Sequence, residues 1–211
     1  MPSGLNDNMK NIFTVILLIL LPLTACTHRS SQSGESPDQL VGVVVSVEKR
    51  ATDIGRQVLE YGGNAIDAAV AVGFVLAVTY PKAGNIGGGG FMVIRLADGT
   101  KTTIDYREKA PLAATRDMYL DSLGNHGTEF SEEGYLAVGV PGSVAGMLYA
   151  LEKYGSMERS EIILPSYTLA NDGIIIDSVF ARSIKDKYDV IIKYPATADI
   201  FLKDTSFYDV G

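Results

Sequence analysis

Hydrophobic and polar positions along the chain predict a mixed α/β fold built around one apolar helix. Residues 41–47 are short, β-branched and apolar, which is typical of a buried strand. Residues 65–78 are so rich in Ala and Val that a helix there has almost no polar face. Such a helix is expected to pack against neighbours on more than one side. Asn64 can cap its N-terminus, and Pro81 closes it.

Two strands and two helices are expected further along the chain. The strands are residues 91–96 and 101–106, and the Asp98-Gly99 pair between them is a strong hairpin signal. The helices cover residues 143–154 and about 160–171, the second with Pro165 near its first turn. Short helices and loops are expected to alternate from residue 174 onward, with 200–204 beginning a hairpin or loop.

One more helix is expected ahead of the core helix. Thr52 or Asp53 can cap its N-terminus, and Gly62-Gly63 ends it. Residues 107–140 have a mixed pattern, with an acidic loop at 129–133. The chain shows no internal repeat and no coiled-coil heptads.

The N-terminal residues have the composition of a targeting segment. Lys10 precedes an apolar run over residues 12–21, which is shorter than the roughly 20 residues that a membrane-spanning helix needs. A cation, a short apolar stretch and small residues are typical of a secretory signal, which begins at Met1 or Met9. The run ends in Leu23-Thr24-Ala25-Cys26, which resembles the lipobox of bacterial lipoproteins. An ordinary signal peptide with an incidental cysteine is the alternative.

These observations divide the chain into three parts. Residues 1–25 are expected to be a lipoprotein signal peptide, and residues 26–40 a Ser-rich tether that cannot order itself. Residues 41–211 form the folded body. Lipidated Cys26 would anchor a periplasmic or cell-surface protein to a membrane. Because the last residues reach no natural stop, the chain is expected to be a fragment.

Composition excludes several classes of chemistry. Lys and Arg number 18 against 25 Asp and Glu, for a net charge of -7, so no basic patch for nucleic acid is expected. One cysteine excludes a disulfide framework and a Cys-rich metal site, and two histidines leave little room for His-based chemistry. Hydrophobic residues make up 46%, enough for a globular core.

A glycine-rich loop at residues 84–90 is the most conspicuous local feature. It has neither the spacing of a dinucleotide fingerprint nor the Gly-Lys-Ser/Thr of a P-loop. Two interpretations remain: a tight crossover from helix to strand, or a chain or ligand lying against the bare backbone. The Ser143 segment superficially suggests a hydrolase elbow, but the serine is expected only to cap a helix. Glu132 and Glu133 are expected to be solvated loop charges.

Arg107 is the one residue whose position suggests a ligand contact. It directly follows a predicted strand, where sites are often built, and a guanidinium can bind a carboxylate through two parallel hydrogen bonds. The alternative is an ordinary salt bridge to Asp105 or Glu108. The residues alone favour this alternative.

Four motifs in order resemble the large subunit of γ-glutamyltranspeptidases, over about residues 41–204. They are Gly62-Gly63-Asn64-Ala65-Ile66-Asp67-Ala68-Ala69-Val70-Ala71, Ala83-Gly84-Asn85-Ile86-Gly87-Gly88-Gly89-Gly90-Phe91-Met92, Asp105-Tyr106-Arg107-Glu108-Lys109-Ala110-Pro111 and Gly139-Val140-Pro141-Gly142-Ser143-Val144-Ala145-Gly146. The resemblance implies an α/β (α+β) fold, part of the four-layer αββα sandwich of N-terminal-nucleophile (Ntn) hydrolases and incomplete in this chain. It also implies a precursor that cleaves itself into a large and a small subunit.

In such a family, the new N-terminal Thr of the small subunit attacks γ-glutamyl amides such as glutathione, with its own amino group as base. The acyl group then passes to water or to an amino acid, with no metal or organic cofactor. The resemblance assigns Arg107 to the α-carboxylate of the γ-glutamyl group. The Thr and the Gly-Gly oxyanion segment belong to the small subunit, so this chain holds no catalytic residue and is expected to be inactive alone. The glycine loop is expected to pack the core helix against the sheet.

Two other interpretations stay open from the sequence. One is a related Ntn acylase that acts on glutaryl or cephalosporin-type amides. The other is an inactive truncated lipoprotein that binds an amino acid or nothing.

Overall fold

The structure is a computed structural model that describes residues 42–211. The expectations for the signal peptide, for Cys26 and for the tether therefore lie outside the described residues. In the described part, no helix is long and apolar enough to cross a membrane.

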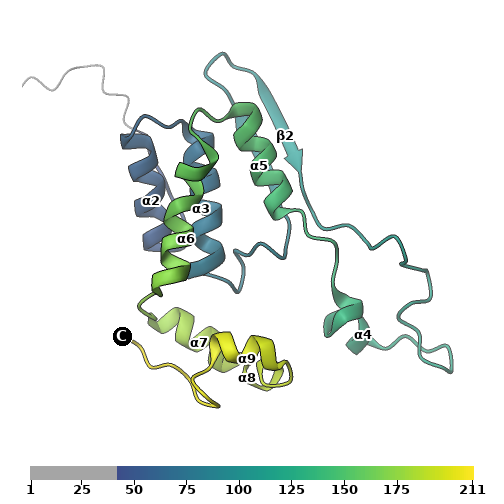
Figure 1. Ribbon diagram of the computed structural model, residues 1–211. Coiled ribbons are helices and arrows are strands. Elements are labelled where there is room, and N and C mark those ends of the chain that lie inside the picture. Colours follow the sequence, from purple (N-terminus) through teal and green to yellow (C-terminus); the bar gives the residue numbers. More distant parts are fainter. Residues whose placement is uncertain (1–41) are drawn as a thin grey trace, which may run out of the picture. The chain divides into compact units, whose positions relative to one another are not determined.

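The central element is α3 (Ala65–Thr79), which contacts helices on several sides. Its neighbours are α2 (Lys49–Glu60), α5 (Ser143–Tyr154) and α6 (Arg159–Asp172), as Figure 1 shows. The side chains of α3 that are buried in the main core include Val70, Ala71 and Phe74. The prediction of an apolar core helix is therefore confirmed.

Asn64 caps α3 as predicted. Its side-chain oxygen accepts hydrogen bonds from the backbone N–H groups of Ile66, at 2.7 Å, and Asp67, at 3.1 Å. The carboxylate of Asp67 in turn accepts from the backbone N–H of Asn64, at 2.7 Å, which completes a reciprocal capping box. The helix ends at Thr79, two residues before Pro81.

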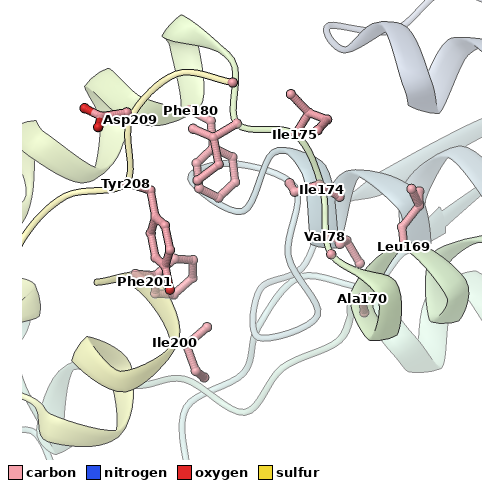
Figure 2. Close-up of a pocket in the computed structure, with 13 residues that line it drawn as sticks. Val78, Leu169, Ala170, Ile174, Ile175, Phe180, Ile200, Phe201, Tyr208 and Asp209 are labelled. Carbon is pink, nitrogen blue, oxygen red and sulfur yellow. The ribbon is translucent and has the colours of Figure 1, made fainter. Parts of the chain in front are cut away.

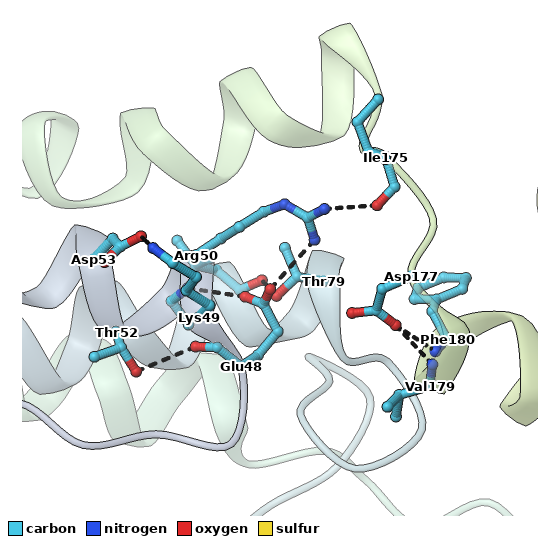
Figure 3. A network of polar contacts seen from close by, with 12 residues as sticks. Glu48, Lys49, Arg50, Thr52, Asp53, Thr79, Ile175, Asp177, Val179 and Phe180 are labelled. Carbon is cyan, nitrogen blue, oxygen red and sulfur yellow. Dashed lines mark hydrogen bonds and ion pairs between the residues drawn. The ribbon is translucent and has the colours of Figure 1, made fainter. Parts of the chain in front are cut away.

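Helix α2 begins earlier than predicted, at Lys49. The cap is Glu48, whose carboxylate accepts from the backbone N–H of Ala51 at 2.9 Å, so the assignment of the cap to Thr52 or Asp53 is wrong. Arg50 holds Glu48 in place with an ion pair at 3.2 Å and donates to the carbonyl of Ile175 at 2.6 Å (Figure 3). A partner 125 positions away in the chain thus stabilises this helix start.

The predicted hairpin is confirmed. Strand β1 (Phe91–Arg95) pairs antiparallel with β2 (Lys101–Asp105), and Gly99 adopts the positive φ of +87° that the turn requires. The pairing extends past the strands, because the backbone N–H of Tyr106 donates to the carbonyl of Gly90 at 3.0 Å. On β1, Ile94 faces the core while Val93 is 82% exposed.

The prediction of a buried strand at residues 41–47 is wrong for the residues described. Residues 42–46 form no regular strand and pair with no strand in the described part of the chain. Val44 packs against the main core, whereas Val43 and Val45 are 83% and 87% exposed. The segment keeps the alternation of a strand, but a ladder needs a hydrogen-bonding neighbour, and none of the described residues supplies one.

Three local predictions also need correction. The acidic loop contains a short helix, α4 (Thr128–Glu132), followed by a 3₁₀ turn, η2 (Tyr135–Ala137). Gly142 is the N-cap of α5, so Ser143 is its first helical residue and not the cap. Pro165 lies in the middle of α6 rather than near its first turn.

The C-terminal residues form short helices and loops, as predicted. They are α7 (Ser178–Asp186), α8 (Tyr188–Ile191) and α9 (Pro195–Phe201), which enclose a small core of Ile184, Ile191 and Leu202. Residues 200 and 201 belong to α9, and a tight turn with a bridge between Lys203 and Ser206 follows.

Candidate functional site

Arg107 lies two residues beyond the end of β2, with an exposed side chain. The carboxylate of Asp105 accepts a hydrogen bond from the backbone N–H of Arg107 at 3.1 Å, which fixes the turn out of the strand. The guanidinium carbon lies 6.0 Å from the centre of the Phe91 ring. Within residues 42–211 no carboxylate forms an ion pair with Arg107, so the predicted alternative of a salt bridge to Asp105 or Glu108 is not observed.

A cavity of about 550 Å³ opens beside Arg107. Its walls come from the segment that follows β2, from the chain around η2 and from Gly87 of the glycine loop. The lining residues include Arg107, Glu108, Lys109, Pro111, Tyr119 and Gly139. Two of these side chains are cationic and one is acidic, so the cavity can accept an anionic group of a small molecule.

The glycine loop lies directly against the backbone beside Arg107. A Cβ at Gly89 would stand 2.7 Å from the Cα of Arg107 and 2.8 Å from the backbone nitrogen of Glu108. At the other end of the loop, a Cβ at Gly84 would stand 2.6 Å from the Cβ of Leu76 on α3. The loop joins α3 to β1, as the crossover interpretation expects, and a chain segment also lies against its bare backbone. The loop reaches the core helix, as expected, and also the strand exit.

The fourth motif, residues 139–146, closes the same region from the other side. The carbonyl of Gly88 accepts from the backbone N–H groups of Gly142, at 2.9 Å, and Ser143, at 3.0 Å. Lys109 and Val140 exchange two backbone hydrogen bonds of 3.1 and 2.8 Å. Three of the four sequence motifs therefore meet around Arg107.

Tyr106 is a central residue of this region that the sequence reasoning missed. Its side chain lies against Gly146, where a Cβ would collide with it, and its ring lies close to Gly90, where a Cβ would stand 3.0 Å away. Burial raises the pKa of the Tyr106 phenol, which keeps the group neutral. The sequence does contain one sign of this packing, namely Gly90 and Gly146, which lie in the two motifs that contact Tyr106.

The first motif contains Asp67, a fully buried carboxylate that the sequence reasoning did not single out. Besides the bond from Asn64, it accepts hydrogen bonds from the backbone N–H of Ser156, at 2.9 Å, the hydroxyl of Ser156, at 2.6 Å, and the backbone N–H of Met157, at 3.2 Å. Burial alone would raise the pKa of Asp67, but the hydrogen bonds from Ser156, Asn64 and Met157 outweigh it and lower the pKa. Asp67 thus joins the start of α3 to the link between α5 and α6.

Other candidate features do not form a second polar site in the described residues. Glu133 is not merely solvated, because its carboxylate pairs with Lys193 at 2.9 and 3.1 Å, while Glu132 is exposed as expected. No group of three or more His, Cys, Asp or Glu side chains between residues 42 and 211 could hold a metal ion. A cavity of about 450 Å³ lined by Val78, Phe180 and Phe201 among others is mainly apolar (Figure 2).

Comparison with known proteins shows which family these motifs belong to. The family model of γ-glutamyltranspeptidase matches residues 51–211. The chain belongs to the γ-glutamyltranspeptidase family. A glutathione hydrolase proenzyme from Pseudomonas sp. (strain A14) is 57% identical over 150 residues, which are 71% of this chain and 26% of that protein. One from Escherichia coli (strain K12) is 52% identical over 144 residues, 68% of this chain and 25% of that protein.

A solved structure agrees with this family assignment. The crystal structure of Helicobacter pylori γ-glutamyltranspeptidase matches with a TM-score of 0.79 and 50% identity, over 81% of this chain and 49% of that chain. The described residues therefore have the mixed α/β fold of an Ntn-hydrolase relative. The chain spans about a quarter of the length of the curated relatives it matches.

Proposed function

We propose that this chain is part of an enzyme that transfers or hydrolyses γ-glutamyl groups of glutathione and related amides. The observation that carries the proposal is Arg107: a guanidinium without an ion pair among the described residues, held at the edge of a cavity by three family motifs. The relatives are glutathione hydrolase proenzymes, which supports both the substrate and a precursor that is cleaved.

Arg107 binds the α-carboxylate of the γ-glutamyl donor in this proposal. The donor carries its reactive amide at the end opposite that carboxylate. A guanidinium fixed by the β2 exit would therefore set how deep the donor sits and align its amide with the nucleophile. Lys109 lines the same cavity and adds to the positive charge that attracts an anionic donor.

The nucleophile is a Thr beyond residue 211, at the N-terminus of a small subunit released from the same precursor. Its hydroxyl oxygen attacks the γ-carbonyl carbon, the proton passes to its own α-amino group, and the amine of the donor leaves with a proton. Water or an acceptor amino acid then attacks the acyl-enzyme and frees the Thr. Residues 41–211 supply the N-terminal portion of the large subunit and the donor's carboxylate site.

The remainder of the protein would complete a four-layer αββα sandwich. The exposed apolar side chains of Val43, Val45 and Val93 support this, because such positions are normally covered by a neighbouring strand or layer.

The N-terminal sequence supports attachment through lipidated Cys26, with the body in the periplasm or at the cell surface. Cys26→Ser should then move the protein to the soluble fraction or leave the signal uncleaved. Membrane retention of a correctly processed variant would contradict lipidation.

The activity is tested with steady-state kinetics of the full-length protein on glutathione and a γ-glutamyl anilide. Arg107→Lys keeps the charge but loses the two-pronged geometry, and Arg107→Ala loses both. We expect the donor KM to rise with both variants, more with Ala, by about 10-fold or more. Self-cleavage should survive, since it needs no bound donor.

Arg56→Lys is the matched control. Arg56 lies on α2, where it pairs with Glu60, and it does not line the cavity beside Arg107. It should leave the donor KM unchanged. A full-length wild-type protein that cleaves itself and turns over neither donor would contradict the proposed function.

A further inference from the structure

Bare backbone surrounds the segment that carries Arg107 on two sides. We call this contact region the glycine junction and define it as residues 88–90, 106–108 and 139–146. Its three segments come from the glycine loop, the β2 exit and the start of α5. On both faces of the segment 106–108, the closest approaches are made to backbone atoms and not to long, adaptable side chains.

Gly89 fixes the first face of this segment. A Cβ at Gly89 would lie 2.7 Å from the carbonyl oxygen of Tyr106, 2.7 Å from the Cα of Arg107 and 2.8 Å from the backbone nitrogen of Glu108. All three are backbone atoms, which cannot move aside by a rotamer change. A methyl group at residue 89 must therefore displace the backbone on which the Arg107 side chain stands.

Gly142 and Gly146 fix the second face. A Cβ at Gly142 would overlap the carbonyl oxygen of Tyr106, and a Cβ at Gly146 would overlap the Cβ and Cγ of the same residue. Backbone hydrogen bonds hold these approaches, from Gly142 to the carbonyl of Gly88 at 2.9 Å and from Tyr106 to the carbonyl of Gly90 at 3.0 Å. The segment that carries Arg107 is thus packed tightly between the glycine loop and the start of α5.

From this geometry we infer that Gly89, Gly142 and Gly146 are positioning residues for Arg107. Their role is to let three backbones approach closely enough to set the direction and reach of the guanidinium into the cavity. The inference rests on the proposed function, because it concerns binding of the donor's carboxylate. These glycines would thus serve donor binding without touching the donor, a role separate from packing the core helix.

The test is a double-mutant cycle of Gly89→Ala with Arg107→Ala in the full-length protein, measured as donor KM and kcat on a γ-glutamyl anilide. If Gly89 acts through Arg107, Gly89→Ala should raise the donor KM about 10-fold with a smaller change in kcat. In the Arg107→Ala background, the same substitution should change KM less than about 2-fold, because the group it positions is gone.

Gly73→Ala is the matched control for general damage. Gly73 lies on α3, and a Cβ there would meet the sulfur of Met147, the flexible part of a core side chain and not backbone. It should leave the donor KM unchanged. Should Gly89→Ala fail to fold, Gly90→Ala takes its place in the cycle, because a Cβ there would come no closer than 3.0 Å to the far end of the Tyr106 ring, which can shift.

The outcomes separate this inference from the proposed function. Equal rises of KM from Gly89→Ala with and without Arg107, or no rise at all, would overturn the positioning role while the Arg107 single variants still test the function. If Arg107→Ala itself leaves the donor KM unchanged, the assignment of the carboxylate site fails, and the positioning role fails with it.

Discussion

Asp67 and Arg107 are charged residues in two of the four motifs, yet their surroundings differ in every respect. Asp67 is fully buried and accepts hydrogen bonds from Asn64, Ser156 and Met157. Arg107 is exposed, and its guanidinium makes only a distant contact with the ring of Phe91 among the described residues.

The difference separates two reasons for keeping a charge in a protein. A buried carboxylate with hydrogen-bond donors all around it has no capacity left for a ligand, so its charge serves the fold. A fixed guanidinium that lacks a carboxylate partner within the described chain, and lines a cavity, retains its donors for a ligand. Substitutions at Asp67 should therefore affect stability, and substitutions at Arg107 should affect binding.

Asp67→Ala should have the largest effect. It removes the charged acceptor of the N–H groups of Asn64, Ser156 and Met157, at an expected cost of about 3–5 kcal/mol in the opening free energy of α3. Hydrogen exchange of the α3 amides in the full-length protein measures this locally. Protection equal to that of the wild type would show that Asp67 does not hold the helix start.

Ser156→Ala should have a smaller effect of the same kind. It removes the 2.6 Å hydroxyl bond to Asp67 but keeps the backbone N–H, so we expect about 1.5 kcal/mol in the same measurement. Ser160→Ala is the control, because Ser160 is exposed on the first turn of α6 and bonds to no described carboxylate. An effect of Ser160→Ala equal to that of Ser156→Ala would remove the case for the Asp67 contact.

The contribution of Asp67 should also depend on pH. Hydrogen bonds lower its pKa in the folded state, so the stability it supplies is fully present above the unfolded value of about 4. It is lost as the pH falls through the folded-state pKa. The difference in α3 protection between wild type and Asp67→Asn should therefore shrink below about pH 4. A difference that stays constant down to the folded-state pKa would contradict the account.

Phe91→Leu should have the smallest effect, on the binding side of the comparison. The exposed ring lies 6.0 Å from the Arg107 guanidinium, a separation at which such contacts are worth about 0.5–1 kcal/mol at most. We expect the donor KM to change by no more than about 5-fold. Steady-state kinetics of the full-length protein would show a larger change if the ring were itself part of the donor site.

Local signals explain which features could be predicted from the sequence. The Asn64 cap, the apolar helix α3 and the Asp98-Gly99 hairpin follow from residues close together in the chain, and all three are confirmed. The place of Arg107 after β2 follows in the same way. Its position suggested a carboxylate as a ligand, but the α-carboxylate of a γ-glutamyl group came only from the resemblance to the family.

Contacts between distant segments explain what was missed. Glu48 replaced the stronger cap candidates Thr52 and Asp53 because Arg50 ties it to Ile175, which no local pattern reveals. Residues 42–46 alternate as a strand does, but a strand also needs a partner, which the described residues do not supply. The contacts of Tyr106 depend on glycines in two other motifs, so only the folded structure brings them together.

The central claim is that Arg107 binds the α-carboxylate of the γ-glutamyl group. A crystal structure of the full-length protein with bound L-glutamate tests it most directly. We expect two N–H···O contacts of about 2.7–2.9 Å between the Arg107 guanidinium and the α-carboxylate. An α-carboxylate held by other residues, with the Arg107 guanidinium turned away from it, would contradict the claim.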